Sequence, residues 1–271
     1  MILASIAMLF VAVFFAFIVW LVYKRFWVKI DPKLEEAMGM LTGLNCGACG
    51  FSSCEIFAKA VSEGKEARCP MLDNGKMSKL YNILGTKGQE STLKKAIVLC
   101  KGTDKDKKFY AQYKGIGSCH AASLNAAYQG CSYGCLGFGD CIKSCPVSAI
   151  SLRDGLVIVD MDKCIGCGLC VKECPRGIIE LIDYNGKFIV SVACSNKDSI
   201  LEVKEACKVG CIGCSLCVKL SSKGSFKMED KLAKVSYSGS DLDREEDYKK
   251  IADKCPMHTI EIEYSKEKAG V

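Results

Sequence analysis

Cysteine is the residue that most constrains this chain. The sequence holds 20 cysteines among 271 residues, against 2 histidines and 5 prolines. Most of them stand a few residues apart in short runs, and several of those runs end in Cys-Pro. A chain with so many thiols either crosslinks them as disulfides or binds metal through them.

The N-terminal segment indicates which of the two applies. Residues 1–23 carry no charged side chain, and Lys24, Arg25 and Lys29 follow at once. This length and composition predict a single membrane-spanning helix, with the positive residues and the soluble part in the cytoplasm. A secretory signal peptide is the alternative, but the segment lacks a positive start and a small-residue cleavage site. In a reducing cytoplasm the thiols would be free, catalytic or bound to metal rather than paired.

The first cysteine run favours a metal site on a small helical domain. Ser52 and Glu55 fit a capping box that opens a helix through Val61. Four thiolates accept either zinc or an iron-sulfur cluster, so this run leaves both open. Its four members are Cys46, Cys49, Cys54 and Cys69.

The second group decides in favour of iron. Residues 164–175 have the spacing of a bacterial ferredoxin run, Cys-x2-Cys-x2-Cys-x3-Cys-Pro, whose fourth cysteine binds the other cluster of a pair. A partner run precedes it at residues 135–146, with Phe138 where the middle cysteine would stand. Cys131 is the expected replacement, with a small buried apolar residue as the alternative. The expected sets are Cys131, Cys135, Cys141 and Cys174 for one cluster, and Cys145, Cys164, Cys167 and Cys170 for the other.

The third group repeats this pattern with half of it missing. Cys207, Cys211, Cys214 and Cys217 follow the spacing of Cys131, Cys135, Phe138 and Cys141. The positions where the ligands of one cluster would fall are Ser221, Glu245, Tyr248 and Ile251. One cluster is therefore expected here, and its ligands are Cys211, Cys214, Cys217 and Cys255.

The total is about four [4Fe-4S] clusters, within a range of three to five. His120 and His258 are expected to be surface or packing residues. The remaining cysteines are open to two interpretations, as buried structural thiols or as ligands of a further metal site. They are Cys100, Cys119, Cys194 and Cys207.

Between the cysteine runs, short β-branched stretches with turn residues predict β-hairpins at 149–160 and 178–192, and a third at 226–237. The expected fold is α+β: a transmembrane helix, a small helical four-cysteine domain and ferredoxin-like domains. The expected divisions are an anchor at 1–29, the four-cysteine domain at 30–75, a helical or irregular connector at 76–130, a two-cluster domain at 131–192 and a one-cluster domain at 193–271.

This pattern predicts electron transfer rather than catalysis on a substrate. Cubane clusters pass single electrons, and several in one chain form a relay. The sequence has no glycine-rich dinucleotide fingerprint and no catalytic triad, and its net charge of +6 is too modest to indicate nucleic acid. A zinc-stabilised adaptor is the alternative from another class, and it would be colourless where iron-sulfur protein is brown.

The segments LNCGACGFSSCEIFAKAV, CSYGCLGFGDCIKSCPVSAI and CIGCGLCVKECP, after a one-pass helix, resemble the B subunit of the Rnf complex. That complex is an ion-translocating ferredoxin:NAD⁺ oxidoreductase. The resemblance implies that electrons enter from soluble ferredoxin and pass to other subunits, without a complete active site on this chain. A polyferredoxin of another membrane redox or hydrogenase complex is the alternative.

A basic stretch ahead of the ferredoxin run offers a docking site for an acidic ferredoxin, because charge steers weak redox encounters. A solvated loop without a partner is the alternative. The lysines concerned are Lys101, Lys105, Lys107, Lys108 and Lys114.

The charge pattern after residue 23 yields a topological prediction. Protease added to intact cells should leave the soluble part uncut, because positively charged flanks stay in the cytoplasm. Opening the cells should make the same part cleavable, which controls for intrinsic resistance. Digestion from outside the cell would contradict the orientation.

Overall fold

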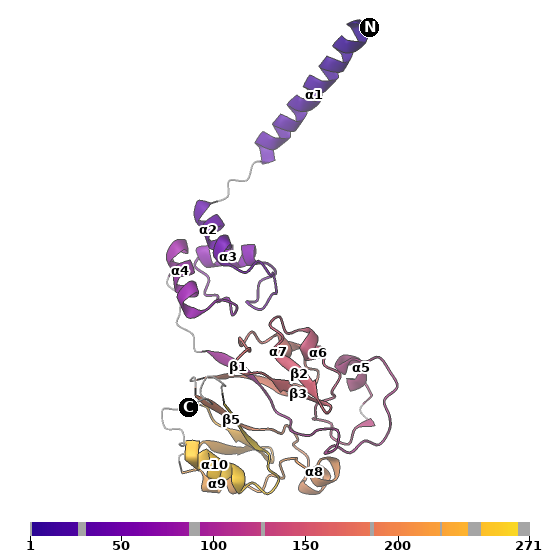
Figure 1. The fold of residues 1–271 in the computed structure, drawn as a ribbon, viewed down its shortest axis with the longest axis vertical. Coiled ribbons are helices and arrows are strands. Elements are labelled where there is room, and N and C mark those ends of the chain that lie inside the picture. The colour runs from indigo at the N-terminus through magenta and orange to yellow at the C-terminus, as the bar shows by residue number, and fades with distance from the viewer. Residues whose placement is uncertain are drawn as a thin grey trace.

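The computed structural model describes residues 2–26, 31–86, 93–125, 128–184, 187–222, 224–237 and 245–264. Figure 1 shows a long helix, a small helical domain and a larger body of short helices and strands. The mixed α+β class expected from the sequence is confirmed.

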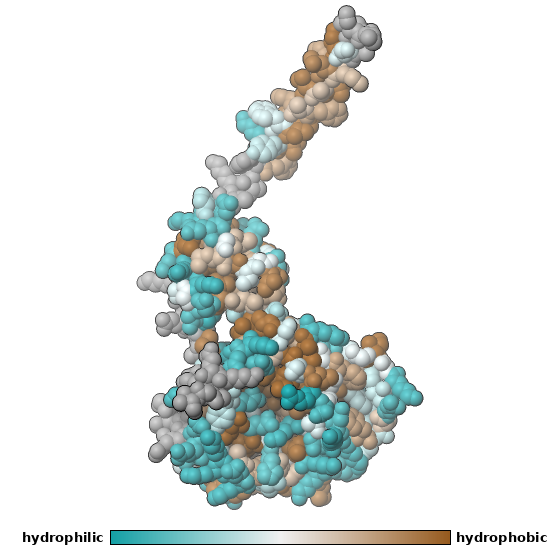
Figure 2. Space-filling model, viewed as in Figure 1, coloured by the Kyte–Doolittle hydropathy of each residue, from teal (hydrophilic) through white to brown (hydrophobic). Residues whose placement is uncertain are grey.

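The long helix α1, Ile2–Phe26, extends away from the rest of the chain (Figure 1). Its 25 residues rise about 37 Å, enough to cross a hydrocarbon core of about 30 Å. Among the described residues it is the one helix long and apolar enough to span a membrane, over Met8–Phe26. Its apolar side chains face outward (Figure 2), so it is not the core helix of a soluble domain.

Three helices form the domain that carries the first cysteine run. They pack through Ala37, Phe57 and Leu80, all buried. Ser53 rather than Ser52 caps the middle helix, and its hydroxyl accepts a hydrogen bond from the backbone of Ile56 at 3.2 Å. The third helix packs here too, so the domain extends past the expected boundary at residue 75. The helices are α2 (Pro32–Met40), α3 (Cys54–Ser62) and α4 (Asn74–Leu84).

The body has a first lobe built on two small sheets. Strands β2 and β3 form the expected hairpin, with Ile150 opposite Val159. Strand β1 pairs antiparallel with β4 and lies in the segment expected to be a helical or irregular connector. The strands are β1 (Lys94–Val98), β2 (Ile150–Arg153), β3 (Leu156–Val159) and β4 (Ile179–Asp183). The helices are α5 (Cys119–Ser123), α6 (Asp140–Lys143) and α7 (Leu169–Glu173).

The second lobe has the same plan. Strands β6 and β7 form the hairpin expected at 226–237, and β5 pairs with the last strand, β8. The strands are β5 (Phe188–Val192), β6 (Phe226–Glu229), β7 (Leu232–Val235) and β8 (Ile260–Tyr264). The helices are α8 (Ile200–Ala206), α9 (Leu216–Leu220) and α10 (Glu245–Asp253).

The hairpin expected at 178–192 is wrong. Its two strands, β4 and β5, exist but pair with β1 and β8 instead of with each other. The turn residues on which that prediction rested, Asn185 and Gly186, lie outside the described residues. Ile182 of β4 and Ile189 of β5 do pack together, but each strand takes its hydrogen-bonding partner from its own lobe, so tertiary pairing overrides the local turn signal.

An apolar core occupies the second lobe at the positions that lack cysteines. Tyr248 and Ile251 are 2% and 3% exposed and pack with Phe226. The Tyr248 ring lies edge-on to Phe226 and Phe188, with centroids 6.0 and 5.9 Å away. Hydrophobic packing here does the structural work that a second cluster would do.

Replacement of this central ring should therefore unfold the second lobe selectively. Tyr248→Ala is expected to lower the free energy of unfolding by about 3–5 kcal/mol, through lost burial and the cavity left behind. Leu201→Ala, at an 80% exposed position on α8, should change it by less than about 0.5 kcal/mol. Urea unfolding of the anaerobic protein, followed by circular dichroism, measures both. Equal effects of the two substitutions would contradict the packing role.

Candidate metal centres

The four cysteines of the helical domain converge as expected. The fold of residues 45–54 brings them together: Asn45, at a φ of 47°, accepts a hydrogen bond from the backbone of Cys54 at 2.8 Å. Burial, with the thiols of Cys49, Cys54 and Cys46 nearby, raises the pKa of Cys69. Two of these cysteines precede α3, Cys54 begins it and Cys69 follows it. Together the four sulfurs are a donor set for zinc or an iron-sulfur cluster.

The ferredoxin run also gathers its expected set. Burial raises the pKa of Cys170 to about 11, and Cys167, Cys164 and Cys145 all add to the shift. Backbone amides point at this set: Ala149 donates to the Cys145 sulfur at 3.3 Å and Ala96 to the Cys164 sulfur at 3.4 Å. Such N–H donors favour the charged sulfur of a bound metal centre.

The neighbouring set differs from the expectation by one residue. Cys119, not Cys131, lines a cavity of about 370 Å³ with Cys135, Cys141 and Cys174. Burial raises the pKa of Cys141 to about 12, and Cys135, Cys119 and Cys174 contribute. The placement of Cys131 in this set is therefore corrected. Sequence distance to the run favoured Cys131, whereas the chain folds back from α5 to supply the fourth thiol.

Phe138, in the position of the missing cysteine, packs against the segment that leads to α5. Its ring lies edge-on to Tyr113, with centroids 5.2 Å apart, in a small core that also includes Cys119. Phe138 stands where the run would have a cysteine, and this was the one signal in the sequence that a cysteine from elsewhere in the chain must complete the set.

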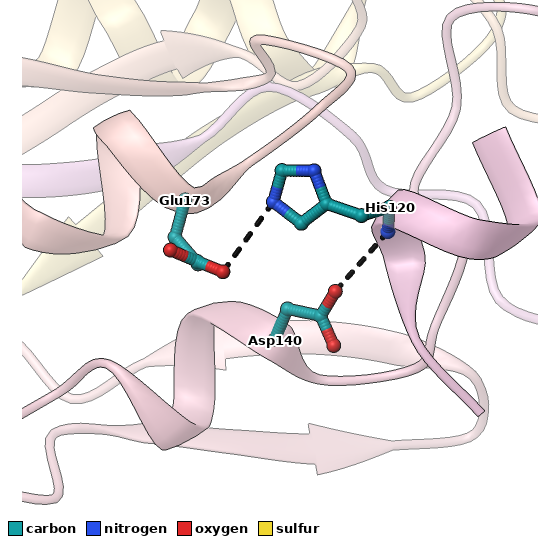
Figure 3. Close-up of side chains that lie close together, drawn as sticks. All are labelled: His120, Asp140 and Glu173. Atoms are coloured by element: carbon teal, nitrogen blue, oxygen red, sulfur yellow. Dashed lines mark hydrogen bonds and ion pairs between the residues drawn. The ribbon is translucent and has the colours of Figure 1, made fainter. Parts of the chain in front are cut away.

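A buried carboxylate fixes α5 beside this set. Asp140 accepts hydrogen bonds from the Ser118 hydroxyl at 2.8 Å and from the His120 backbone at 3.1 Å. Burial alone would raise the pKa of Asp140, but these hydrogen bonds outweigh it and the pKa falls. The Nε2 atom of His120 also lies 3.3 Å from a carboxylate oxygen of Glu173 (Figure 3). These contacts, which sequence analysis missed, tie Cys119 to the segments that hold Cys141 and Cys174.

The second lobe gathers the set expected there. Cys211, Cys214, Cys217 and Cys255 line a cavity of about 410 Å³. Burial and the other three thiols raise the pKa of Cys217 to about 11. The backbone of Thr259 donates to the Cys255 sulfur at 3.5 Å, the counterpart of Ala149 at Cys145.

The four cysteines that the sequence assigned to no cluster lie in two places. Cys119 has joined the set of Cys135, and the other three share a cavity with the displaced Cys131. That third cavity has a volume of about 370 Å³ and is lined by Cys100, Cys131, Cys194 and Cys207.

The basic stretch is only partly available for docking. Lys107 is 7% exposed, and its ammonium donates to the carbonyls of Cys135 at 2.9 Å and Gly155 at 3.0 Å. Lys101 and Lys108 form ion pairs with Glu261 and Glu205. The inclusion of Lys107 in a surface patch is therefore wrong, because this side chain is a buried cation between cysteine sets.

Lys107 acts on the sulfurs around it. Burial raises the pKa of Cys100 and of Cys135, and the Lys107 ammonium opposes the shift in both. Gly155 allows this approach: it has a φ of 69°, and a β-carbon there would collide with the Asp104 side chain. The loop that carries Lys107 thus rests directly on the turn between β2 and β3.

Comparison with known proteins supports the metal chemistry. The family described as "4Fe-4S binding domain" matches residues 157–180, and the family described as "Putative Fe-S cluster" matches residues 41–71. These regions hold parts of the ferredoxin pair and the whole four-cysteine run of the helical domain.

Three relatives can be aligned with most of this chain. The B subunit of the Na⁺-translocating ferredoxin:NAD⁺ oxidoreductase complex of Acetobacterium woodii is 33% identical, over 92% of this chain and 74% of that protein. The B subunit of the proton-translocating ferredoxin:NAD⁺ oxidoreductase complex of Clostridium ljungdahlii is 38% identical, over 86% of this chain and 83% of that protein. The B subunit of the ion-translocating oxidoreductase complex of Methanosarcina acetivorans is 34% identical, over 69% of this chain and 72% of that protein. With cysteine sets, family matches and relatives in agreement, the chain belongs to the Rnf family of B subunits, from the ion-translocating ferredoxin:NAD⁺ oxidoreductases.

Proposed function

We propose that this chain is a membrane-anchored relay that accepts electrons from reduced soluble ferredoxin and passes them to other subunits of an ion-pumping ferredoxin:NAD⁺ oxidoreductase. The observation that carries the proposal is that a thiol of one cysteine set lies close enough to the next set to influence the pKa of a thiol there. Cys46 of the helical domain influences the pKa of Cys167, and Cys170 in turn influences that of Cys141. These interactions connect three of the four sets in series, which supports a relay; the fourth set lies in the second lobe.

Sixteen cysteines would hold four [4Fe-4S] clusters in this relay. Each cluster takes up and releases one electron. The protein's part is to bury the sulfurs, to point backbone amides at them and to keep the charge around them fixed. The proposed ligand sets are Cys46, Cys49, Cys54 and Cys69; Cys119, Cys135, Cys141 and Cys174; Cys145, Cys164, Cys167 and Cys170; and Cys211, Cys214, Cys217 and Cys255.

Helix α1 would hold the relay at the cytoplasmic face of the inner membrane. Its apolar length fits a bilayer, and Lys24 and Arg25 lie in its last turn. In this placement soluble ferredoxin reaches the body, and the partner subunits lie beside α1. A membrane anchor also explains why an electron carrier exposes so many large apolar side chains at one end (Figure 2).

Mixing the full-length anaerobic protein with reduced ferredoxin tests this function. The charge-transfer absorption of the clusters should bleach rapidly in a stopped-flow experiment, because electrons enter this chain directly. NADH alone should leave the clusters oxidised, since reduction of NAD⁺ is expected on another subunit. Clusters that ferredoxin cannot reduce would contradict the proposal.

The buried cation yields a second prediction. A positive charge beside a cluster stabilises its reduced form, so Lys107→Met should lower the reduction potential of the nearest cluster. The expected change is on the order of 60 mV, a tenfold change in a one-electron equilibrium. Lys105→Met removes an exposed charge from the same loop and should leave the potentials unchanged. Redox titration monitored by electron paramagnetic resonance measures both, and equal potentials in the two variants would show that Lys107 does not act on a cluster.

A further inference from the structure

Four cysteines outside the sets of the proposed relay face one another across the third cavity. They come from segments far apart in the chain: Cys100 follows β1, Cys194 follows β5, and Cys207 ends α8. Cys131 completes the lining. No local spacing motif could have revealed this group, because the tertiary fold alone brings the four together.

The cavity resembles its neighbour in size. The empty space in each, with its opening to solvent included, is about 370 Å³, and the neighbour is lined by Cys119, Cys135, Cys141 and Cys174. The sulfurs also interact with one another, since Cys100 and Cys131 both influence the pKa of Cys207. Four cysteines around such a space form a complete donor set for one cubane.

The surroundings of these sulfurs suit negative charge. Asn196, 2% exposed, directs its side-chain amide at the Cys131 sulfur at 3.6 Å and its backbone amide at the Cys194 sulfur at 3.5 Å. The Lys107 side chain lines the same cavity, and its positive charge acts on the Cys100 thiol. Neutral thiols in an apolar core would need neither a buried cation nor a buried amide, each of which costs free energy to desolvate.

The position of the cavity indicates its role. The backbone of Cys135, in the set of the first lobe, donates to the Cys100 sulfur at 3.5 Å. On the other side, the backbone of Cys211, in the set of the second lobe, donates to the Cys194 sulfur. The cavity therefore lies between the two lobes, and two of its sulfurs accept hydrogen bonds from ligand residues of the two lobes.

We propose that Cys100, Cys131, Cys194 and Cys207 hold a fifth [4Fe-4S] cluster that links the clusters of the two lobes. This cluster accepts one electron from the cluster of one lobe and gives one electron to that of the other, with no bond made or broken. The proposal rests on the proposed relay in taking the other sixteen cysteines as ligands. Every cysteine of the chain then belongs to a set of four.

Metal analysis of the full-length, anaerobically purified chain tests this. Five cubanes require about twenty iron atoms and twenty labile sulfides per chain, against about sixteen of each for four. Cys194→Ala and Cys207→Ala should each reduce both counts by about four. Val209→Ala removes apolar atoms from the lining of the same cavity but keeps all four thiols, and should retain the full counts.

The outcomes separate the two proposals. Sixteen iron atoms in the unaltered protein, with or without one zinc, would overturn the fifth cluster and leave the four-cluster relay intact. Eight or fewer would overturn the relay itself. If an alanine variant fails to fold and loses all its iron, the count for the unaltered protein decides. Spin integration of the fully reduced protein gives an independent readout, with five spins per chain expected instead of four.

Discussion

The burial of thiol groups in sets of four is the constraint on which the rest of this structure depends. The body is built from two-stranded sheets and helices of four to nine residues, elements that are marginal by themselves. Burial raises the pKa of at least one thiol in every set, so without metal those thiols remain neutral and contribute little more than small apolar side chains. Metal binding turns the same groups into strong crosslinks between segments, and ligation becomes part of the folding free energy.

Polar groups around the sulfurs are arranged for the charge that such ligation brings. Backbone amides of Ala96, Ala149 and Thr259 point at single sulfurs of the sets in both lobes. Lys107 and Asn196 are buried where the two lobes meet; two carbonyls accept from the Lys107 ammonium, and the Asn196 amide donates to the Cys131 sulfur. Lys107 thus places a buried positive charge at the junction of the lobes, and a positive charge there favours the reduced form of a nearby cluster.

Sequence reasoning succeeded where the chemistry is local. The spacing from Cys164 to Cys170 indicated a cluster, and the missing cysteines at Tyr248 and Ile251 indicated that one had been lost, which fits the apolar core found there. It failed where tertiary structure chooses between candidates. Cys131 is nearer in sequence to Cys135, yet α5 supplies Cys119. The turn signal at 185–186 suggested a hairpin, yet β4 pairs with β1 and β5 pairs with β8. Such choices depend on contacts that no short stretch of sequence contains.

The pairing of β5 with β8 has a consequence for biosynthesis. Strand β8 ends at Tyr264, so the second lobe cannot close until translation has passed that residue. The first lobe pairs β1 with β4 and can close well before that, once the chain has passed Asp183. A ribosome-bound chain would therefore present a finished first lobe beside an open second one. Insertion of metal should follow the same order along the chain, and a nascent polypeptide stalled before β8 would carry exposed thiols open to oxidation.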